Sequence, residues 1–97
     1  MGASVLFVVE QVEHERGWGS RPEGYQCFLT EADADTYIKA DLEEERKRNP
    51  SGIAPDCYWS NHKVGYREAL PKYVEQVEKS STKRMYADRI SDLTKER

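Results

Sequence analysis

Residues 5–9, Val5-Leu6-Phe7-Val8-Val9, form a continuous apolar run, and the interpretation of the whole chain starts from them. The next residues, Glu10-Gln11-Val12-Glu13-His14, change towards an alternation of apolar and polar side chains. A continuous run is typical of a strand buried on both faces, and alternation is typical of a strand with one face in solvent. We therefore predict a strand that is buried at its start and solvated at its end.

A loop signal follows this strand. The stretch Arg16-Gly17-Trp18-Gly19-Ser20-Arg21-Pro22-Glu23-Gly24 is rich in glycine and holds one tryptophan between two glycines. Gly and Pro clusters between apolar segments are typical of turns. After the loop, Tyr25-Gln26-Cys27-Phe28 predicts a short second strand that returns antiparallel to the first.

The clearest helix signal begins at Thr30-Glu31-Ala32-Asp33, where Thr30 is suited to be the N-cap and acidic charges lie in the first turn. Apolar residues at helical spacing predict one narrow buried stripe: Ala34, Tyr37, Ile38 and Leu42. The segment Asn49-Pro50-Ser51-Gly52 ends the helix.

The remaining chain predicts one more strand and a helical C-terminal part. Residues 57–64 are aromatic at first and polar later, which indicates a third strand, and a helical pattern begins at Leu70. Ser80-Ser81-Thr82 interrupts that pattern. We predict an α+β fold: a small antiparallel sheet of about three strands in β-β-α-β-α order, with a packed helix and a C-terminal helical extension. Residues 1–80 then form the single small domain, and residues 81–97 form the extension.

Charge is divided unevenly along the 97 residues. The net charge is −3, but residues 1–45 carry three basic and eleven acidic side chains, while residues 46–97 carry twelve basic and seven acidic ones. Counterion release requires a concentrated positive surface, so this balance argues against general nucleic-acid binding. The two halves either neutralise each other within one fold or attract across subunits. Nucleic-acid mimicry by the acidic helix is a further alternative.

The sequence has no features of a secretory signal or a membrane span. Residues 5–9 are too short for a signal and follow no basic region, and no apolar run approaches the ~20 residues of a membrane helix. Cys27 and Cys57 lack Cys-x-x-Cys spacing, which favours reduced thiols. We expect a cytoplasmic protein that does not contact a membrane.

No residue pattern predicts metal or catalytic chemistry. His14, Cys27, Cys57 and His62 are zinc ligand types, but they do not occur in close pairs. Cys57 and His62 are five residues apart, which places them on opposite faces of a strand. No serine lies in a nucleophile motif. We therefore predict a protein that is not an enzyme and uses no cofactor.

The functional prediction depends on arginine and aromatic side chains in loop and strand positions. A tryptophan with small neighbours has little local surface to bury against, and exposed aromatic clusters are typical of binding interfaces. The predicted partner- or ligand-binding residues are Arg16, Trp18, Arg21, Tyr25 and Trp59. We expect them to contact a protein. The alternative ligand is a nucleotide-like anion, with the arginines on its phosphate and Trp18 stacked on its base. A third interpretation is a hairpin loop whose tryptophan covers one end of the core.

The predicted C-terminal helix has too few apolar residues to be stable alone in water. A symmetric dimer would cover it and would bring the basic half of each chain to the acidic half of the other. We therefore expect a homodimer with Tyr86, Ile90 and Leu93 in the contact.

The succession of elements resembles a class of known proteins. The strand at Phe7-Val8-Val9-Glu10, the tryptophan loop, the strand at Tyr25 to Phe28 and the helix from Thr30 to Ile38 resemble small bacteriophage-encoded accessory proteins, over residues 5–62. Those proteins are commonly acidic α+β proteins that bind and inhibit a host protein or defence factor. The resemblance implies an inhibitor that occludes a surface of a host or bacterial protein, and it assigns no functional residues.

Overall fold

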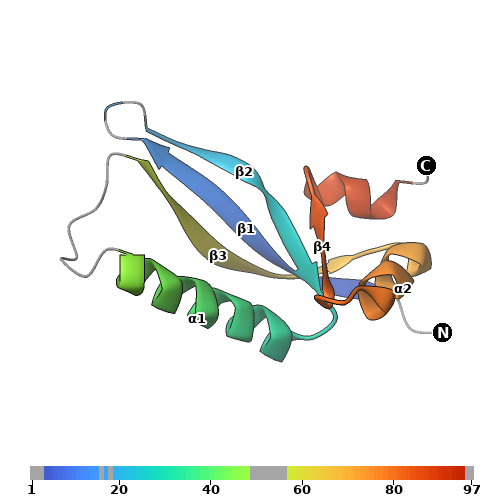
Figure 1. Ribbon diagram of the computed structural model, residues 1–97. Coiled ribbons are helices and arrows are strands. Elements are labelled where there is room, and N and C mark those ends of the chain that lie inside the picture. Colours follow the sequence, from blue (N-terminus) through green and yellow to red (C-terminus); the bar gives the residue numbers. More distant parts are fainter. Residues whose placement is uncertain (1–3, 16, 18, 49–56, 96–97) are drawn as a thin grey trace.

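The computed structural model describes residues 4–15, 17, 19–48 and 57–95, and describes residues 57–59 by their backbone alone. Four strands form one antiparallel sheet in the spatial order β3-β1-β2-β4 (Figure 1). The α+β class and the β-β-α-β-α order of the first five elements are confirmed, but the sheet has four strands. The elements are β1 (Val5–Glu15), β2 (Gly19–Phe28), α1 (Glu31–Arg48), β3 (Cys57–Glu68), α2 (Pro71–Lys79), β4 (Arg84–Ala87) and the 3₁₀ helix η1 (Ile90–Thr94).

The central strand β1 is buried on both faces at its start. Phe7 and Val9 pack against Phe28 of β2 and Ala34 of α1. Leu6 and Val8 belong to a second core on the other face, which is completed by Cys27, Ala69, Val77, Ala87 and Leu93. The continuous apolar run of residues 5–9 therefore supplies two small cores, one on each face of the sheet.

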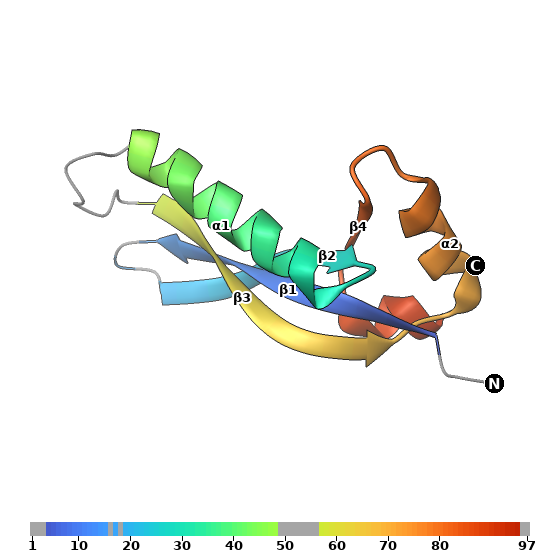
Figure 2. The same cartoon turned by 90° about the horizontal axis from the view of Figure 1, so that it is seen from below.

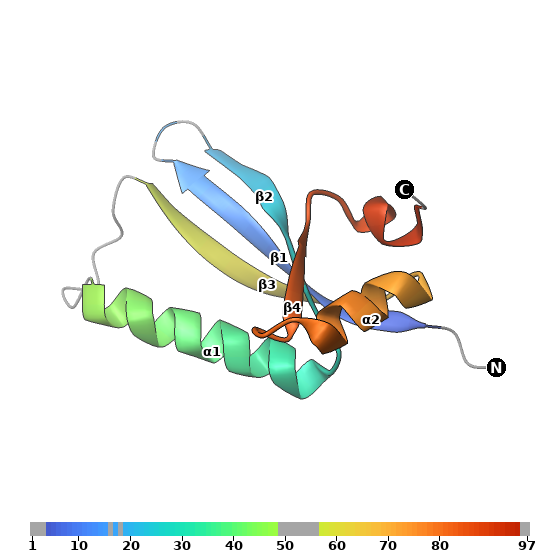
Figure 3. The same cartoon turned by 45° about the vertical axis from the view of Figure 1, so that its right-hand side comes forward.

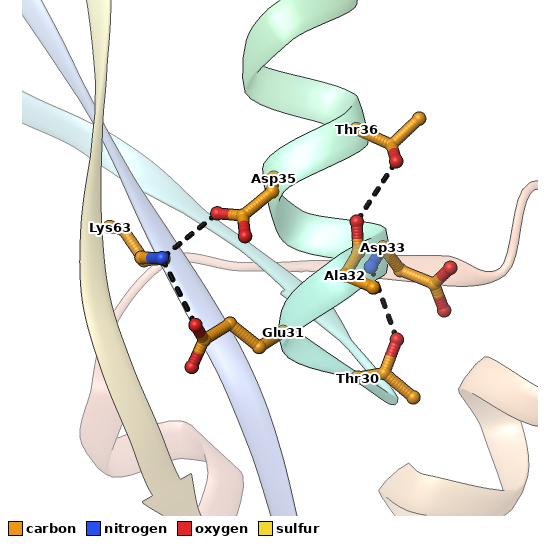
Figure 4. Close-up of polar contacts among 7 residues, drawn as sticks. All are labelled: Thr30, Glu31, Ala32, Asp33, Asp35, Thr36 and Lys63. Atoms are coloured by element: carbon orange, nitrogen blue, oxygen red, sulfur yellow. Dashed lines mark hydrogen bonds and ion pairs between the residues drawn. The ribbon is translucent and has the colours of Figure 1, made fainter.

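Helix α1 begins as the sequence predicts. The backbone N–H of Asp33 donates to Thr30 Oγ1 at 3.1 Å, so Thr30 is the N-cap (Figure 4). The predicted stripe is confirmed at its first three positions, Ala34, Tyr37 and Ile38. It is wrong at Leu42, which is 46% exposed. The second half of α1 therefore contributes little to the core.

Polar contacts, not apolar ones, connect the outer side of α1 to the edge strand β3. Lys63 Nζ lies 2.9 Å from Asp35 and 3.3 Å from Glu31 (Figure 4). Lys63 donates a hydrogen bond to each of these carboxylates, and the two bonds raise the pKa of its ammonium group. Further along the helix, Asn61 Nδ2 donates to Asp41 Oδ2 at 2.5 Å. A helix held by such contacts does not need an apolar residue at its fourth turn.

Strand β2 begins at Gly19, six residues before the predicted start. Pro22 lies opposite Val12 in the register with β1, and a register shift accommodates the extra residue on β2. Proline is tolerated at sheet edges because it has no N–H to donate. Here β4 pairs only with Tyr25–Phe28, so the first half of β2 is an edge. The Gly and Pro signals therefore predicted a loop that ends at Gly24, whereas the strand already begins at Gly19.

Within the predicted C-terminal helical extension, residues 84–87 form a strand, β4, and residues 90–94 form a short 3₁₀ helix. After α2 the chain turns at Lys83, whose φ is 56°, and residues 84–87 pair antiparallel with residues 25–28 of β2. The turn brings this segment to the open edge of β2, where pairing satisfies the backbone groups of that edge and packs Met85 and Ala87 into the second core. The 3₁₀ helix η1 follows, and the division of the chain at residue 80 stays a prediction.

The apolar residues of this segment are used within one protomer. Leu93 is 1% exposed in the second core, and Ile90 packs against the same core. The predicted dimer contact of Tyr86, Ile90 and Leu93 stays a prediction. Tyr86 remains 50% exposed, but its ring packs over Gly24 of β2 and its hydroxyl donates to the Glu23 carbonyl at 2.9 Å.

The two faces of the sheet are covered unequally. Helix α1 runs along one face towards the end where β1 turns into β2, which we call the hairpin end (Figures 2 and 3). Helices α2 and η1 lie at the other end of the sheet, near the start of β1 (Figure 1). Among the described helices, none is long and apolar enough to cross a membrane. At the hairpin end, only the α1 face has a described helix beside it.

Candidate functional site

The structure separates the predicted binding residues. Arg21 lies opposite Glu13 on the α1 face, whereas Tyr25 lies opposite Glu10 on the other face. The backbone of Trp59, in β3, lies opposite Glu13 of β1, and the side chain of Trp59 lies outside the description. Arg16 and Trp18 also lie outside the described residues. The described members therefore do not form one pocket.

Arg21 belongs to a carboxylate cluster on the α1 face. Its guanidinium lies 3.5 Å from Glu13, which is only 6% exposed. Hydrogen bonds with Glu23 and then Glu15 lower the pKa of Glu13, and the bond to Glu13 raises the pKa of Glu15. Beside the cluster is a cavity of about 180 Å³, lined by Glu13, Glu15, Gly19, Ser20 and Arg21. This lining brings two carboxyls against one guanidinium, a balance that does not favour an anionic ligand.

The opposite face at the hairpin end carries a surface that we call the open patch. Because side chains alternate along a strand, residues two and four places beyond Val8 share its face. The strand registers add their neighbours on β2 and β3 to the same face. The open patch consists of Glu10, Val12, His14, Ser20, Pro22, Tyr25, Ser60 and His62. No described helix lies over it (Figures 1 and 2).

Hydrogen bonds join the side chains of the open patch across three strands. His14 Nδ1 lies 2.7 Å from Ser20 Oγ, and His14 Nε2 lies 2.7 Å from Ser60 Oγ. Ser60 Oγ is also 2.8 Å from His62 Nε2. A hydroxyl has one proton and two lone pairs, so Ser60 can donate to at most one of the two imidazoles. At least one imidazole therefore donates its N–H to Ser60.

A further hydrogen bond fixes two other side chains of the open patch. The Tyr25 hydroxyl donates to Glu10 Oε2 at 3.3 Å. Partial burial and the nearby Glu10 raise the pKa of Tyr25, so this donor keeps its proton at neutral pH. The imidazoles, hydroxyls and phenol are consequently held in defined positions before any partner arrives.

These side chains do not make a metal centre within the described residues. There, no group of three or more His, Cys, Asp or Glu is arranged to hold an ion. Cys27 lies in the second core, and burial raises the pKa of its thiol to about 12. The register of β1 with β3 places the backbone of Cys57 opposite Glu15, and His62 opposite Glu10. Ser60 has imidazole neighbours, but it lies on an open sheet surface and not in an enclosed pocket.

A second surface, which we call the edge groove, lies between β4 and α2. It encloses about 490 Å³. One wall is formed by residues 85–88, the other by Lys72, Tyr73 and Gln76 of α2, and Asp92 and Leu93 of η1 complete it. Sequence reasoning missed this groove because it interpreted residues 84–87 as helix.

The open patch was missed for a different reason. Tyr25 was predicted as a binding residue, but His14, Ser60 and His62 were considered only one by one. His14 and Ser60 are 46 residues apart, and only the registers of β1 with β2 and β3 join them. No protein-family model matches the chain, and no curated protein and no solved structure is significantly similar to it.

Proposed function

We propose that this chain is a non-enzymatic protein-binding module that contacts its partner through the open patch. The observation that carries the proposal is a half of a sheet face that no described helix covers and whose side chains are already hydrogen-bonded to one another. Pre-ordered side chains lose less conformational entropy when a partner binds. Tyrosine, serine and histidine also supply the mixture of contact area and hydrogen bonding that protein recognition uses.

A protein partner is favoured over a small anion by the charges at this end of the sheet. Arg21, the described arginine of the predicted anion site, is paired with Glu13 and adjoins Glu15 and Glu23. An anionic ligand would have to displace or approach these carboxyls. The open patch, in contrast, presents hydroxyl, imidazole and phenol groups together with the carboxylate of Glu10 on an extended surface, which suits a protein face.

The resemblance to phage-encoded accessory proteins supplies a partner class for this proposal. On that basis the partner is a host or bacterial protein in the cytoplasm, and binding inhibits it by covering one of its surfaces. Such a mechanism requires a stable complex and no chemical step, which agrees with the use of one ordered face.

The test is capture of a partner from a lysate of the native cell by the full chain, followed by mass spectrometry. Ser20→Arg and His62→Arg place a long cation on the patch at exposed positions. Each should weaken binding of the captured partner by about 2 kcal/mol or more if it disrupts a hot spot. Ala40→Arg places the same side chain on the exposed side of α1 and should bind normally. A partner that binds both patch variants normally but does not bind the Ala40→Arg variant would refute the open patch as the contact surface.

A further inference from the structure

Strand β4 has one paired edge and one unpaired edge. Its residues 84–87 pair with β2, and β4 is the last strand on that side of the sheet. In the described part of the chain, no backbone group outside β2 hydrogen-bonds to β4. An unpaired edge presents a row of N–H and C=O groups that another extended chain can satisfy.

The edge groove runs along this unpaired backbone. Met85, Tyr86, Ala87 and Asp88 are consecutive, and all four line it. Three of them belong to β4, and successive side chains of a strand point to opposite faces, so a cavity along the strand edge borders consecutive residues, whereas one over a face borders alternate ones. Met85 and Ala87 indeed pack with the second core, while Tyr86 packs over Gly24 on the other face. The groove is therefore open to the hydrogen-bonding groups of β4.

We infer that the edge groove binds an extended peptide segment, which adds to β4 as a fifth strand. Peptide recognition by strand addition takes its affinity from main-chain hydrogen bonds and its specificity from pockets for alternate side chains. Helix α2 forms the facing wall through Lys72, Tyr73 and Gln76, so the space next to β4 is bounded on its far side. A second copy of this chain would bring its own α2 into that space, whereas a single extended segment would not.

The lining also indicates which peptide side chains fit. Tyr73 and Met85 offer apolar surface to one of the alternate side chains. The charged part of the lining holds Asp88 and Asp92 with Lys72, and Asp92 also lies 3.7 Å from Lys95. Asp88 follows directly after the last residue of β4. Charge complementarity therefore favours a peptide that places a basic side chain near the end of β4, beyond an apolar one.

The experiment is selection of a displayed random heptapeptide library on the full chain, followed by synthesis of the enriched peptides. We expect enriched peptides to carry an apolar and a basic side chain two positions apart, and to protect the backbone amides of β4 from hydrogen exchange. N-methylation of the peptide backbone should weaken binding at least about tenfold at alternate positions and have little effect between them, because an added strand pairs through every second residue.

Two substitutions on α2 separate groove binding from binding elsewhere. Gln76→Trp fills the groove and should weaken binding of the selected peptide at least about tenfold, a hot-spot-sized loss. Glu78→Trp adds the same ring to an exposed position of α2 outside the lining and should bind normally. The thermal transition of both variants shows that they are folded. Enriched peptides that are indifferent to Gln76→Trp or to N-methylation would overturn the inference, as would no enrichment at all.

Peptide binding in the edge groove does not involve the residues of the open patch. Ser20→Arg and His62→Arg should leave binding of the selected peptide unchanged, so the proposed function and the groove can fail separately. A concentration-dependent dimer in light scattering, with amides of β4 protected in the absence of peptide, would identify a second copy as the occupant and would also overturn the proposal.

Discussion

The contact between Tyr86 and Gly24 can be tested by a single methyl group. Gly24 is buried in β2, and a Cβ at this position would lie 2.5 Å from Tyr86 Cζ, and closer still to its Oη and Cε2. Real Cβ atoms do not approach other atoms so closely, and Gly24→Ala therefore has to displace the ring. Displacement also breaks the hydrogen bond from the Tyr86 hydroxyl to the Glu23 carbonyl.

The sign of the effect should depend on whether the ring is present. Overpacking costs about 1–3 kcal/mol, while replacing a strand glycine by alanine gains about 0.5–1 kcal/mol. With Tyr86 in place, we expect Gly24→Ala to lower the free energy of unfolding by about 1–2 kcal/mol. In a Tyr86→Ala background the clash is absent, so the same methyl group should raise it by about 0.5–1 kcal/mol.

The assay is a double-mutant cycle measured by chemical denaturation, with thermal melts in parallel. A change of 1 kcal/mol corresponds to about 4–8 °C for a domain of this size. Tyr66→Ala is the matched control, because Tyr66 is an exposed aromatic of β3 and does not contact Gly24. Gly24→Ala should be equally destabilising with and without Tyr66. A destabilisation that persists unchanged in the Tyr86→Ala background would refute the proposed packing of β4 on β2.

Three further predictions follow from local contacts. The hydrogen bond to Glu13 raises the pKa of Glu15. The contribution of protonated Glu15 to the stability of the fold is therefore present below the ordinary pKa of 4.5 and is lost as the pH rises through the folded-state value. Glu15→Gln keeps a donor to Glu13 without this loss and should raise Tm at pH 7 but not at pH ~4; an equal gain at both would contradict the pairing. Thr30→Ala removes the N-cap bond of α1 and should cost about 1 kcal/mol in chemical denaturation, and no loss would mean that the cap is dispensable. In a Cys57→Ser background, Cys27 should react with a thiol reagent only as fast as the chain unfolds, since burial raises its pKa to about 12; rapid labelling of the folded chain would contradict its burial.

Local signals predicted the elements that depend on local physics. The apolar run of residues 5–9 identified the central strand, and Thr30 identified the start of α1 because a cap acts within one turn. The start of β2 was misplaced because Pro22 is a breaker in most strands and is tolerated here only at a partly unpaired edge. That edge is a property of the assembled sheet, and no window of sequence contains it.

Non-local pairing explains what the sequence could not predict about the end of the chain and the surfaces. Residues 84–87 contain apolar side chains at a spacing compatible with helix, and they form a strand because β2, about sixty residues earlier, leaves an edge for them. The same limit applies to the open patch. His14 and Ser60 lie near Ser20 and His62 only through the registers of three strands, and a one-residue slip would move them to the other face.

The sharing of β1 between two cores has a consequence for the order in which the molecule assembles. Residues 5–68 contain β1, β2, α1 and β3, and so hold every buried member of the core beneath α1. The core on the other face needs Ala69, Val77, Ala87 and Leu93. As the chain leaves the ribosome, Leu6, Val8 and Cys27 therefore stay exposed to water until residues 69–93 have been translated. A chain truncated within residues 69–93 would have a sheet with one covered face and one exposed apolar face, the kind of species that chaperones and proteases remove.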